Sequence, residues 1–330
     1  MSILSIRSEA GADGARAATP RGRERADGAS ASTRYQPAEP IDVHTTLQLI
    51  ARGGDGPCFR RTPTGVWLTM RTPSGGATLH VGLWSAGGIE ATSWGPGAEW
   101  AIDGVPALLG AHDDWAELDV STSPLLSEVL RRNPGLRLSR NRLVFEMLVP
   151  AVLEQKVTAL EAWRAWRQLV RAHGEPAPGP APEGMVVAPG AETWRMIPSW
   201  EWHTAGVGPQ RSETVVRASR LADAIERTID EPPAEASRRL RSLPGIGVWT
   251  AAEVALRAHG DPDAVSVGDY HLASSVGVAL TGAPVDDDAM LELLAPWAGH
   301  RQRVLRLIGR SGIHKPRRGP KITIQDHRRH

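Results

Sequence analysis

Two segments in the first third of the chain alternate apolar and polar positions with the period of a β-strand. The alternating apolar positions are Val66, Leu68, Met70, Leu79, Val81 and Leu83. A Pro-Ser-Gly-Gly sequence between the segments favours a tight turn, so we predict two antiparallel strands. A weaker strand over 89–94 and helical stretches over 44–51 and 105–111 complete a small α+β domain, which we place at 37–123.

After residue 123 the apolar period becomes helical. Leu153, Val157 and Leu160 share one face of a helix predicted to follow Pro150. A second helix is predicted from the apolar positions Val215, Ala218, Ala222, Ile225 and Ile229. Between these helices, residues 174–193 are rich in proline and glycine, which predicts an exposed loop without regular structure. The predicted fold class is therefore α+β, with an antiparallel β-rich N-terminal domain followed by an all-helical domain at 124–312.

The ends of the chain differ in composition from its middle. Residues 1–36 consist mainly of Ala, Gly, Ser and Arg, and we expect a disordered arm because they can bury little apolar surface. The whole chain has 38 basic and 37 acidic residues, yet its last thirty residues hold ten basic side chains against only Asp326. This basic end, which includes a tail at 313–330, favours a polyanionic partner such as nucleic acid. A solvated tail has the same composition.

Composition excludes several classes of function. No segment reaches the roughly 18 apolar residues of a membrane span, and the N-terminus lacks the apolar core of a signal peptide, so we expect a cytoplasmic protein. Cys58 is the single cysteine, which excludes an internal disulfide, a cysteine zinc site and a four-cysteine iron–sulfur cluster. The histidines show no metal-binding spacing. We expect a monomer that requires no metal and no cofactor.

The segment 243–251, Leu-Pro-Gly-Ile-Gly-Val-Trp-Thr-Ala, lies between two predicted helices at 234–242 and 248–259. Gly245 and Gly247 allow a tight hairpin whose backbone N–H groups point outward and can bind a phosphate. Thr250 can satisfy a free backbone group or reach a phosphate oxygen. A simple connection between two packed helices is the alternative.

A Gly-Asp pair, Gly268 and Asp269, follows at the end of a short apolar run and precedes a helix predicted over 270–280. This order of hairpin, helix, loop and Gly-Asp resembles the helix-hairpin-helix DNA glycosylases. The closest resemblance is to the bacterial 3-methyladenine DNA glycosylase II type, whose Pro-Gly-Ile-Gly-x-Trp-Thr-Ala pattern is matched at 244–251. The segments 134–139 and 152–158 are also similar to that family, so the resemblance covers about 120–312. The strand-rich region before it lies where that family has its β-rich N-terminal domain.

The resemblance implies that Asp269 faces a nucleotide flipped out of the DNA. An aspartate before a helix is also a common N-cap, and the two roles are compatible, because backbone N–H bonds keep a carboxylate ionised. As the bond to the base breaks, positive charge develops on the deoxyribose, and a fixed anion stabilises that charge and can activate the attacking water.

The resemblance also implies a base pocket lined by Trp249, whose ring face would attract a cationic alkylated purine; core packing is the alternative. We expect Gln155 and Tyr270 beside the base, although a surface glutamine is as compatible with the sequence at 155. Family members have an aromatic residue one turn after this tryptophan and a tryptophan near the last helix, whereas this chain has Glu253 and Arg306 there. Trp297 can substitute for the second. These departures bear on which damaged bases the pocket accepts.

Five arginines lie within residues 131–142, around a Pro-Gly turn. As a DNA-binding loop, this segment would use Arg137 on a phosphate and Leu138, rather than Leu136, to fill the gap left by the flipped nucleotide. A solvated basic loop is the alternative. The remaining expected DNA contacts are in the hairpin, at Leu243, Gly245, Gly247 and Thr250.

These observations predict a DNA repair glycosylase, acting in the cytoplasm at the nucleoid, that excises alkylated bases from double-stranded DNA. We expect a monofunctional enzyme that uses water, because the chain has only three lysines, Lys156, Lys315 and Lys321, and the place just after the hairpin, where related strand-cutting enzymes have a lysine, holds Trp249. One alternative is a non-catalytic helix-hairpin-helix DNA-binding protein. Another is a glycosylase for deaminated or mismatched bases.

Overall fold

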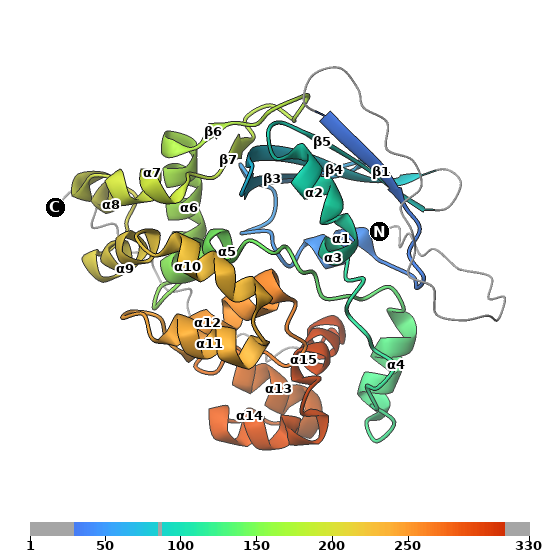
Figure 1. Cartoon of the computed structure of the whole chain (residues 1–330). Helices are drawn as coiled ribbons and strands as arrows, with labels where there is room; N and C mark the ends of the chain where they lie inside the picture. Colours follow the sequence, from blue (N-terminus) through green and yellow to red (C-terminus); the bar gives the residue numbers. More distant parts are fainter. Residues whose placement is uncertain (1–29, 85–87, 314–330) are drawn as a thin grey trace.

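An antiparallel sheet and a larger set of helices make up the fold (Figure 1). The computed structural model describes residues 30–84 and 88–313. The sheet has the strand order β1-β5-β4-β3-β2. Its strands are β1 Ser30–Tyr35, β2 Phe59–Thr62, β3 Gly65–Thr72, β4 Gly75–Trp84 and β5 Gly88–Trp94. Within the described part of the chain, no helix has the length and apolar character to cross a membrane.

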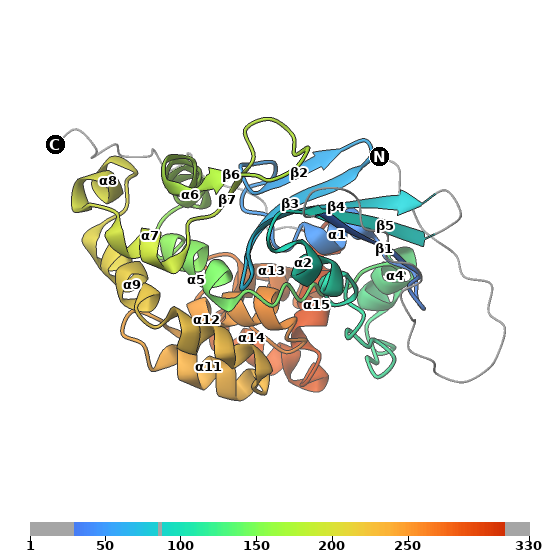
Figure 2. The ribbon, with the colours of Figure 1, turned by 45° about the horizontal axis from the view of Figure 1, so that its top comes forward.

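The inner face of the sheet packs on α1 (Val43–Leu47), α2 (Ala98–Asp103) and α3 (Val105–Leu108), as Figure 2 shows for α1 and α2. Five of the six alternating residues predicted from the sequence lie in this core, and Val66, Leu79 and Val81 are fully buried, whereas Leu83 is 39% exposed. The turn between β3 and β4 joins them in the predicted antiparallel register. The α+β class and the strands at the alternating segments are therefore confirmed.

Strand β1 lies in the segment that composition predicts as disordered. Its residues pair with β5 from Ser30 opposite Trp94 to Tyr35 opposite Ile89. Ala31, Thr33 and Tyr35 are buried, so three side chains in alternation are enough for an edge strand once β5 is beside them. The prediction of disorder is therefore wrong for 30–35, and 1–29 lies outside the described residues.

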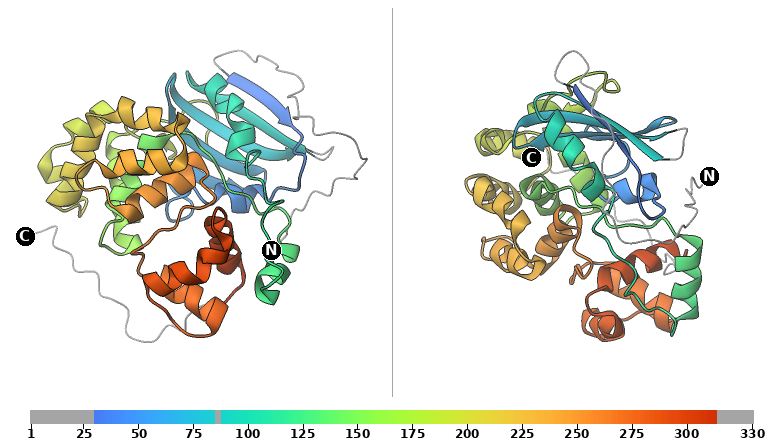
Figure 3. Two further views of the ribbon diagram at one scale, coloured as in Figure 1. Left: turned by 60° about the horizontal axis from the view of Figure 1, so that its bottom comes forward. Right: turned by 45° about the vertical axis from the view of Figure 1, so that its right-hand side comes forward.

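The helices form two packed groups (Figure 3). One group comprises α5 Val144–Leu153, α6 Ala159–His173, α7 Ala191–Met196, α8 Ser199–Thr204, α9 Pro209–Ser219, α10 Ala222–Glu226, the 3₁₀ turn Arg227–Asp230, α11 Pro233–Arg241 and α12 Val248–Val254, with a π-helical turn at Ala255–His259. The other comprises α4 Pro124–Arg132, α13 Leu272–Thr281, α14 Asp287–Leu294, the 3₁₀ turn Ala295–Trp297 and α15 Arg301–Arg310. Helix α4 thus packs with the C-terminal helices, and Asp269 lies on the connection between the groups.

Both long helices predicted from apolar spacing are divided. Pro150 lies inside α5, which ends at Leu153, and Thr158 starts α6 with a capping box to Glu161. Lys156, between them, has a φ of 54° and breaks the helical path. The second predicted helix is interrupted between α9 and α10. Spacing alone missed these breaks because the apolar period continues across each of them.

Residues 174–190 form a strap across the outer face of the sheet. Strands β6 (Glu175–Pro176) and β7 (Val186–Val187) pair within it. The Val186 carbonyl accepts a 2.6 Å hydrogen bond from the Thr69 hydroxyl, and the Arg71 guanidinium donates to the Ala188 carbonyl at 3.0 Å. Val187 is 1% exposed. The predicted exposed loop is therefore found at 177–184, whereas the prediction is wrong for 185–189, which are mostly buried because the open sheet face provides partners that are distant in sequence.

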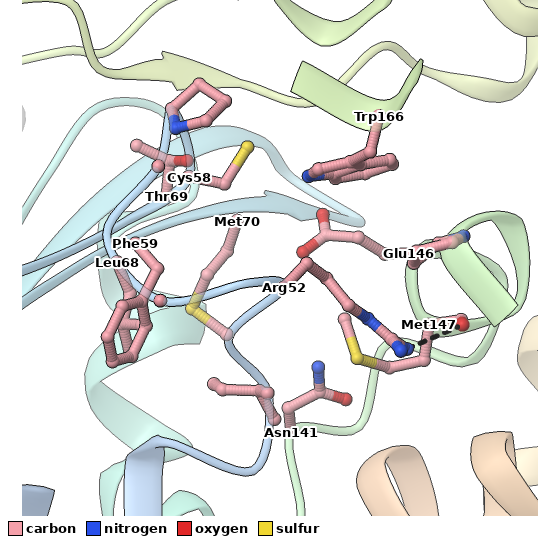
Figure 4. A pocket seen from close by; sticks show the side chains of 15 residues that line it. Arg52, Cys58, Phe59, Leu68, Thr69, Met70, Asn141, Glu146, Met147 and Trp166 are labelled. Atoms are coloured by element: carbon pink, nitrogen blue, oxygen red, sulfur yellow. Dashed lines mark hydrogen bonds between the residues drawn. The ribbon is translucent and has the colours of Figure 1, made fainter. Parts of the chain in front are cut away.

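A small cavity of about 40 Å³, with mostly apolar walls, lies between the sheet and helices α5 and α6 (Figure 4). It is lined by Arg52, Cys58, Asn141, Glu146 and Trp166, among others. None of the residues predicted for the functional site is among its walls. Burial raises the pKa of the Glu146 carboxyl to about 7, although the Arg71 backbone N–H donates to it at 2.6 Å. Burial likewise raises the pKa of the Cys58 thiol to about 12.

Glu146 is expected to lower the stability of the protein as pH rises through about 4.5 to 7. Because its pKa is higher in the folded than in the unfolded state, the folded state binds the extra proton in that window and loses this advantage above it. The stability of Glu146→Gln relative to the parent protein should therefore be higher at pH 8 than at pH 5. Urea midpoints at both pH values measure this gain, with exposed Glu192→Gln as the control. The same difference at both pH values would contradict the prediction.

Candidate nucleic-acid interface and active site

The hairpin joins α11 to α12 in the predicted position. Its turn is closed by a hydrogen bond from the Ile246 N–H to the Leu243 carbonyl at 3.0 Å, and Ile246 is 5% exposed. Gly245 has a φ of 94°, and a Cβ there would lie 2.3 Å from the Thr214 hydroxyl oxygen. Gly245 and Gly247 are exposed, so their backbone faces solvent at the start of α12. The apolar anchor inside and the bare backbone outside suit contact with an anion.

Two side chains from other parts of the chain hold the hairpin in place. The Gln155 amide, just after α5, donates to the Gly245 carbonyl at 2.9 Å and to the Thr250 hydroxyl at 2.8 Å. The Arg217 guanidinium, from α9, donates to the Pro244 carbonyl at 2.9 Å. Lys156, next to Gln155, is exposed. One basic side chain, that of Arg217, therefore adjoins the hairpin.

The Asp269 carboxylate lies at the start of α13 and is half-buried. Its Oδ1 accepts hydrogen bonds from the backbone N–H groups of His271 at 2.8 Å and Leu272 at 3.0 Å. Gly268, with a φ of 89°, allows the chain to turn just before it. One oxygen of the carboxylate therefore holds the turn that leads into α13, two residues before the N-cap His271, and this fixes its position.

The second oxygen of Asp269 faces α12. The indole N–H of Trp249 donates to Oδ2 at 3.3 Å, and Trp249 is half-buried. Trp249 follows the hairpin by two residues, so the hairpin backbone, an aromatic ring and a fixed carboxylate adjoin one another. This arrangement can bind a phosphate, contact a base and stabilise positive charge.

Comparisons with known proteins point to one superfamily. No family model matches the chain. The DNA-3-methyladenine glycosylase of Bacillus subtilis is 26% identical over 199 residues, which are 56% of this chain and 65% of that protein. The probable bifunctional transcriptional activator/DNA repair enzyme AlkA of Mycobacterium tuberculosis is 28% identical over 187 residues, 54% of this chain and 35% of that protein. The chain thus spans less than two thirds of each of these relatives.

Solved structures share the fold over most of the chain. The 3-methyladenine DNA-glycosylase of Archaeoglobus fulgidus has a TM-score of 0.71 at 16% identity, covering 84% of this chain and 98% of that one. The 8-oxoguanine glycosylase/lyase of Clostridium acetobutylicum, in complex with double-stranded DNA, has a TM-score of 0.61 at 15% identity, covering 88% and 98%. The relatives and structural neighbours are DNA glycosylases of the helix-hairpin-helix superfamily.

Within this fold, Leu138 and Arg137 of the 131–142 segment do not lie where their predicted contacts with DNA would require them. Leu138 is 1% exposed and packs with Leu49 and Leu256, so it does not lie where it could fill a gap in DNA. Arg137 is half-buried and donates to the carbonyls of Pro134 at 3.2 Å and Leu136 at 2.7 Å. Burial lowers the pKa of its guanidinium. Arg137 therefore braces its own turn.

The residues predicted for the base pocket and the hairpin differ in their contacts and in their exposure to solvent. The Trp249 indole N–H donates to Asp269, and Gly245 and Gly247 are open to solvent. Tyr270 is 86% exposed and meets only the edge of the His271 ring among the aromatic contacts of the described residues, so its place beside the base stays a prediction. Thr250 is 2% exposed and its hydroxyl accepts from Gln155, which is inconsistent with a direct phosphate contact.

Leu243 and Gln155 support the hairpin from inside. Leu243 is partly buried against the core of the first helical group, and Gln155 is committed to the two hairpin acceptors. Arg217 was not predicted, because nothing in the sequence links it to Pro244, twenty-seven residues later. Among the described residues, no group of three or more His, Cys, Asp or Glu side chains is arranged to hold a metal ion.

Proposed function

We propose that this protein is a monofunctional DNA glycosylase that flips an alkylated base of the 3-methyladenine type out of double-stranded DNA and excises it hydrolytically. The observation that carries the proposal is the contact between the Trp249 indole and the Asp269 carboxylate, next to the exposed Gly-Ile-Gly hairpin. The names of the relatives, DNA-3-methyladenine glycosylase and DNA repair enzyme AlkA, support the same activity. The protein would act as a monomer in the cytoplasm.

The chemistry follows from the two oxygens of Asp269. One is held by backbone N–H groups, so the carboxylate stays in place while the bond between sugar and base breaks. The anion then stabilises the positive charge on the deoxyribose and orients water for attack on the sugar carbon. The hairpin backbone would hold a phosphate beside the flipped nucleotide, and Trp249 would contact the base.

A second candidate is excision of a neutral, deaminated or mismatched base. One turn beyond Trp249, where an aromatic residue would favour a cationic base, the chain places the ion pair of Glu253 and Arg257. Burial lowers the pKa of nearby Arg306 to about 10, with further lowering by the charge of Arg257. The positive charge of Arg306 on that side would repel a cationic base, whereas it would not repel a neutral base.

The deciding experiment is an excision assay on duplexes that each contain one lesion. The set should include 3-methyladenine, 7-methylguanine, hypoxanthine, uracil and 8-oxoguanine, with an undamaged duplex as control. Release of methylated purines in preference to the others supports the main proposal. Preferential release of hypoxanthine or uracil supports the second candidate. Tight DNA binding with no release from any duplex would indicate a non-catalytic DNA-binding protein.

The enzyme is expected to leave an intact strand with an abasic site. Strand cleavage through a Schiff base with the sugar needs an amine, and the position just after the hairpin holds Trp249. Incubation with borohydride should give no covalent adduct, and strand breaks should appear only after alkali. Lys156→Asn should give the same products. Asparagine is chosen because it tolerates the positive φ at that position. An adduct, or breaks without alkali, would refute the use of water alone.

A further inference from the structure

Glu253 lies on the same face of α12 as Trp249, one turn further on. Its Oε2 accepts a 2.7 Å hydrogen bond from the Arg257 guanidinium, and its Oε1 accepts a 2.6 Å hydrogen bond from the Ser266 hydroxyl. The side chains of Glu253 and Arg257 are 13% and 15% exposed. Because water is largely excluded, both contacts should be stronger than similar contacts on the surface.

Ser266 belongs to the turn that presents Asp269. The Asp269 N–H donates to the Ser266 carbonyl at 3.1 Å, so the two residues close one turn of the backbone. Ser266 is 8% exposed. Fixing the Ser266 hydroxyl on Glu253 therefore fixes the turn that ends at Asp269. The catalytic loop is thus attached to α12 at two points, through Ser266 to Glu253 and through Asp269 to Trp249.

The ion pair is also attached to the N-terminal part of the chain. The Arg257 Nε–H donates to the Leu49 carbonyl at 2.9 Å, and the charge of Arg52 acts on Glu253. Arg52 is itself paired with Glu154 at 2.7 Å, beside Gln155, which holds the hairpin. Burial opposes ionisation of Glu253, but the guanidinium of Arg257, the Ser266 hydroxyl and the charge of Arg52 offset it and lower its pKa. The carboxylate is therefore anionic at neutral pH.

From these contacts we infer that Glu253, oriented by Arg257, is a positioning residue that sets the Asp269 carboxylate against Trp249 through the Ser266 hydroxyl. The inference rests on the proposed function, because Asp269 is the group being positioned. It assigns a specific task to a carboxylate that stands where the related family has an aromatic ring. Glu253 would act without touching the DNA, so its loss should affect the chemical step more than binding.

The test compares Ser266→Ala and Glu253→Gln with the conservative Ser266→Thr. Ser219→Ala is the matched control, since the Ser219 hydroxyl is equally buried but donates to Val215 within α9. The three measurements are the single-turnover excision rate, the affinity for a duplex with an abasic site, and the NMR signal of the Trp249 indole N–H, assigned with Trp249→Phe. The indole signal reports the contact with Asp269 and needs no activity.

Ser266→Ala and Glu253→Gln should each lower the single-turnover rate by roughly tenfold to a hundredfold, as expected for a misplaced catalytic group, and shift the Trp249 signal. Affinity for the abasic duplex should stay within about threefold. The double variant should be little worse than the poorer single variant, because both changes break one link. Ser266→Thr should restore the rate, and Ser219→Ala should change neither the rate nor the signal.

An unchanged rate and an unchanged Trp249 signal in Ser266→Ala would overturn the inference. A loss of rate equal to that in Ser219→Ala would do the same, because it would reflect general destabilisation. If the parent protein excises none of the bases tested, the proposed function fails. The positioning role is then decided by the Trp249 signal alone, which should move in Ser266→Ala and not in Ser219→Ala.

Discussion

Asp269→Asn is expected to slow base excision by roughly a hundredfold to a thousandfold, the usual loss when one fixed electrostatic group is removed from an active site. Asparagine keeps an oxygen that can accept the N–H groups of His271 and Leu272, so the start of α13 should be preserved. What is lost is the negative charge opposite the developing positive charge on the sugar. Single-turnover excision, measured with enzyme in excess, gives the size of the effect.

Asp286→Asn is the matched control for this substitution. Asp286 caps α14 by accepting from the Ala289 N–H at 2.9 Å, much as Asp269 accepts from the N–H groups of His271 and Leu272 at the start of α13, but Asp286 lies outside the candidate site. The control should excise at the parent rate, and both variants should bind an abasic duplex with nearly unchanged affinity. Excision by Asp269→Asn at close to the parent rate would remove Asp269 from the mechanism.

Gly245→Ala is expected to weaken binding to duplex DNA by tenfold or more, the effect of losing about 1.4 kcal/mol of binding free energy. The new Cβ would lie 2.3 Å from the Thr214 hydroxyl oxygen and would also strain a residue whose φ is 94°. The hairpin must shift to relieve this contact, which moves its exposed backbone away from the phosphate. Fluorescence anisotropy with a labelled duplex at constant salt measures the change.

The control for Gly245→Ala is Gly282→Ala, at the end of α13. Gly282 has a similar φ of 81°, but nothing lies within 4 Å of a Cβ built there. Both variants should lose stability through backbone strain, and only Gly245→Ala should lose affinity. Equal affinities for the two variants would show that the hairpin is not part of the DNA interface.

The elements that sequence predicted best are those specified by neighbouring residues. Alternation was sufficient to predict β3 and β4, and the glycines of the hairpin predicted the turn between α11 and α12. Asp269 was recognised from its place after Gly268, and its contact with the α13 backbone agrees with the predicted capping role. In each of these cases the deciding interactions lie within a few residues or one turn.

The features that the sequence did not reveal depend on partners far away in sequence. Leu138 is buried because Leu49 and Leu256 surround it, and no pattern in 131–142 indicates those neighbours. Gln155 faces a hairpin ninety residues later. Strand β1 needs the edge of β5, which a low-apolar segment cannot reveal. The Glu253–Arg257 spacing could have indicated an ion pair, but not its link to Ser266.

The strap over the outer face of the sheet has a consequence for how the protein unfolds. Its residues leave α6, bond to the Thr69 and Arg71 side chains, and return to the helices at α7. The sheet therefore cannot separate from the helices without breaking these bonds and exposing Val187. Strands and helices should melt together in a single cooperative transition, and a fragment ending near residue 123 should not fold by itself.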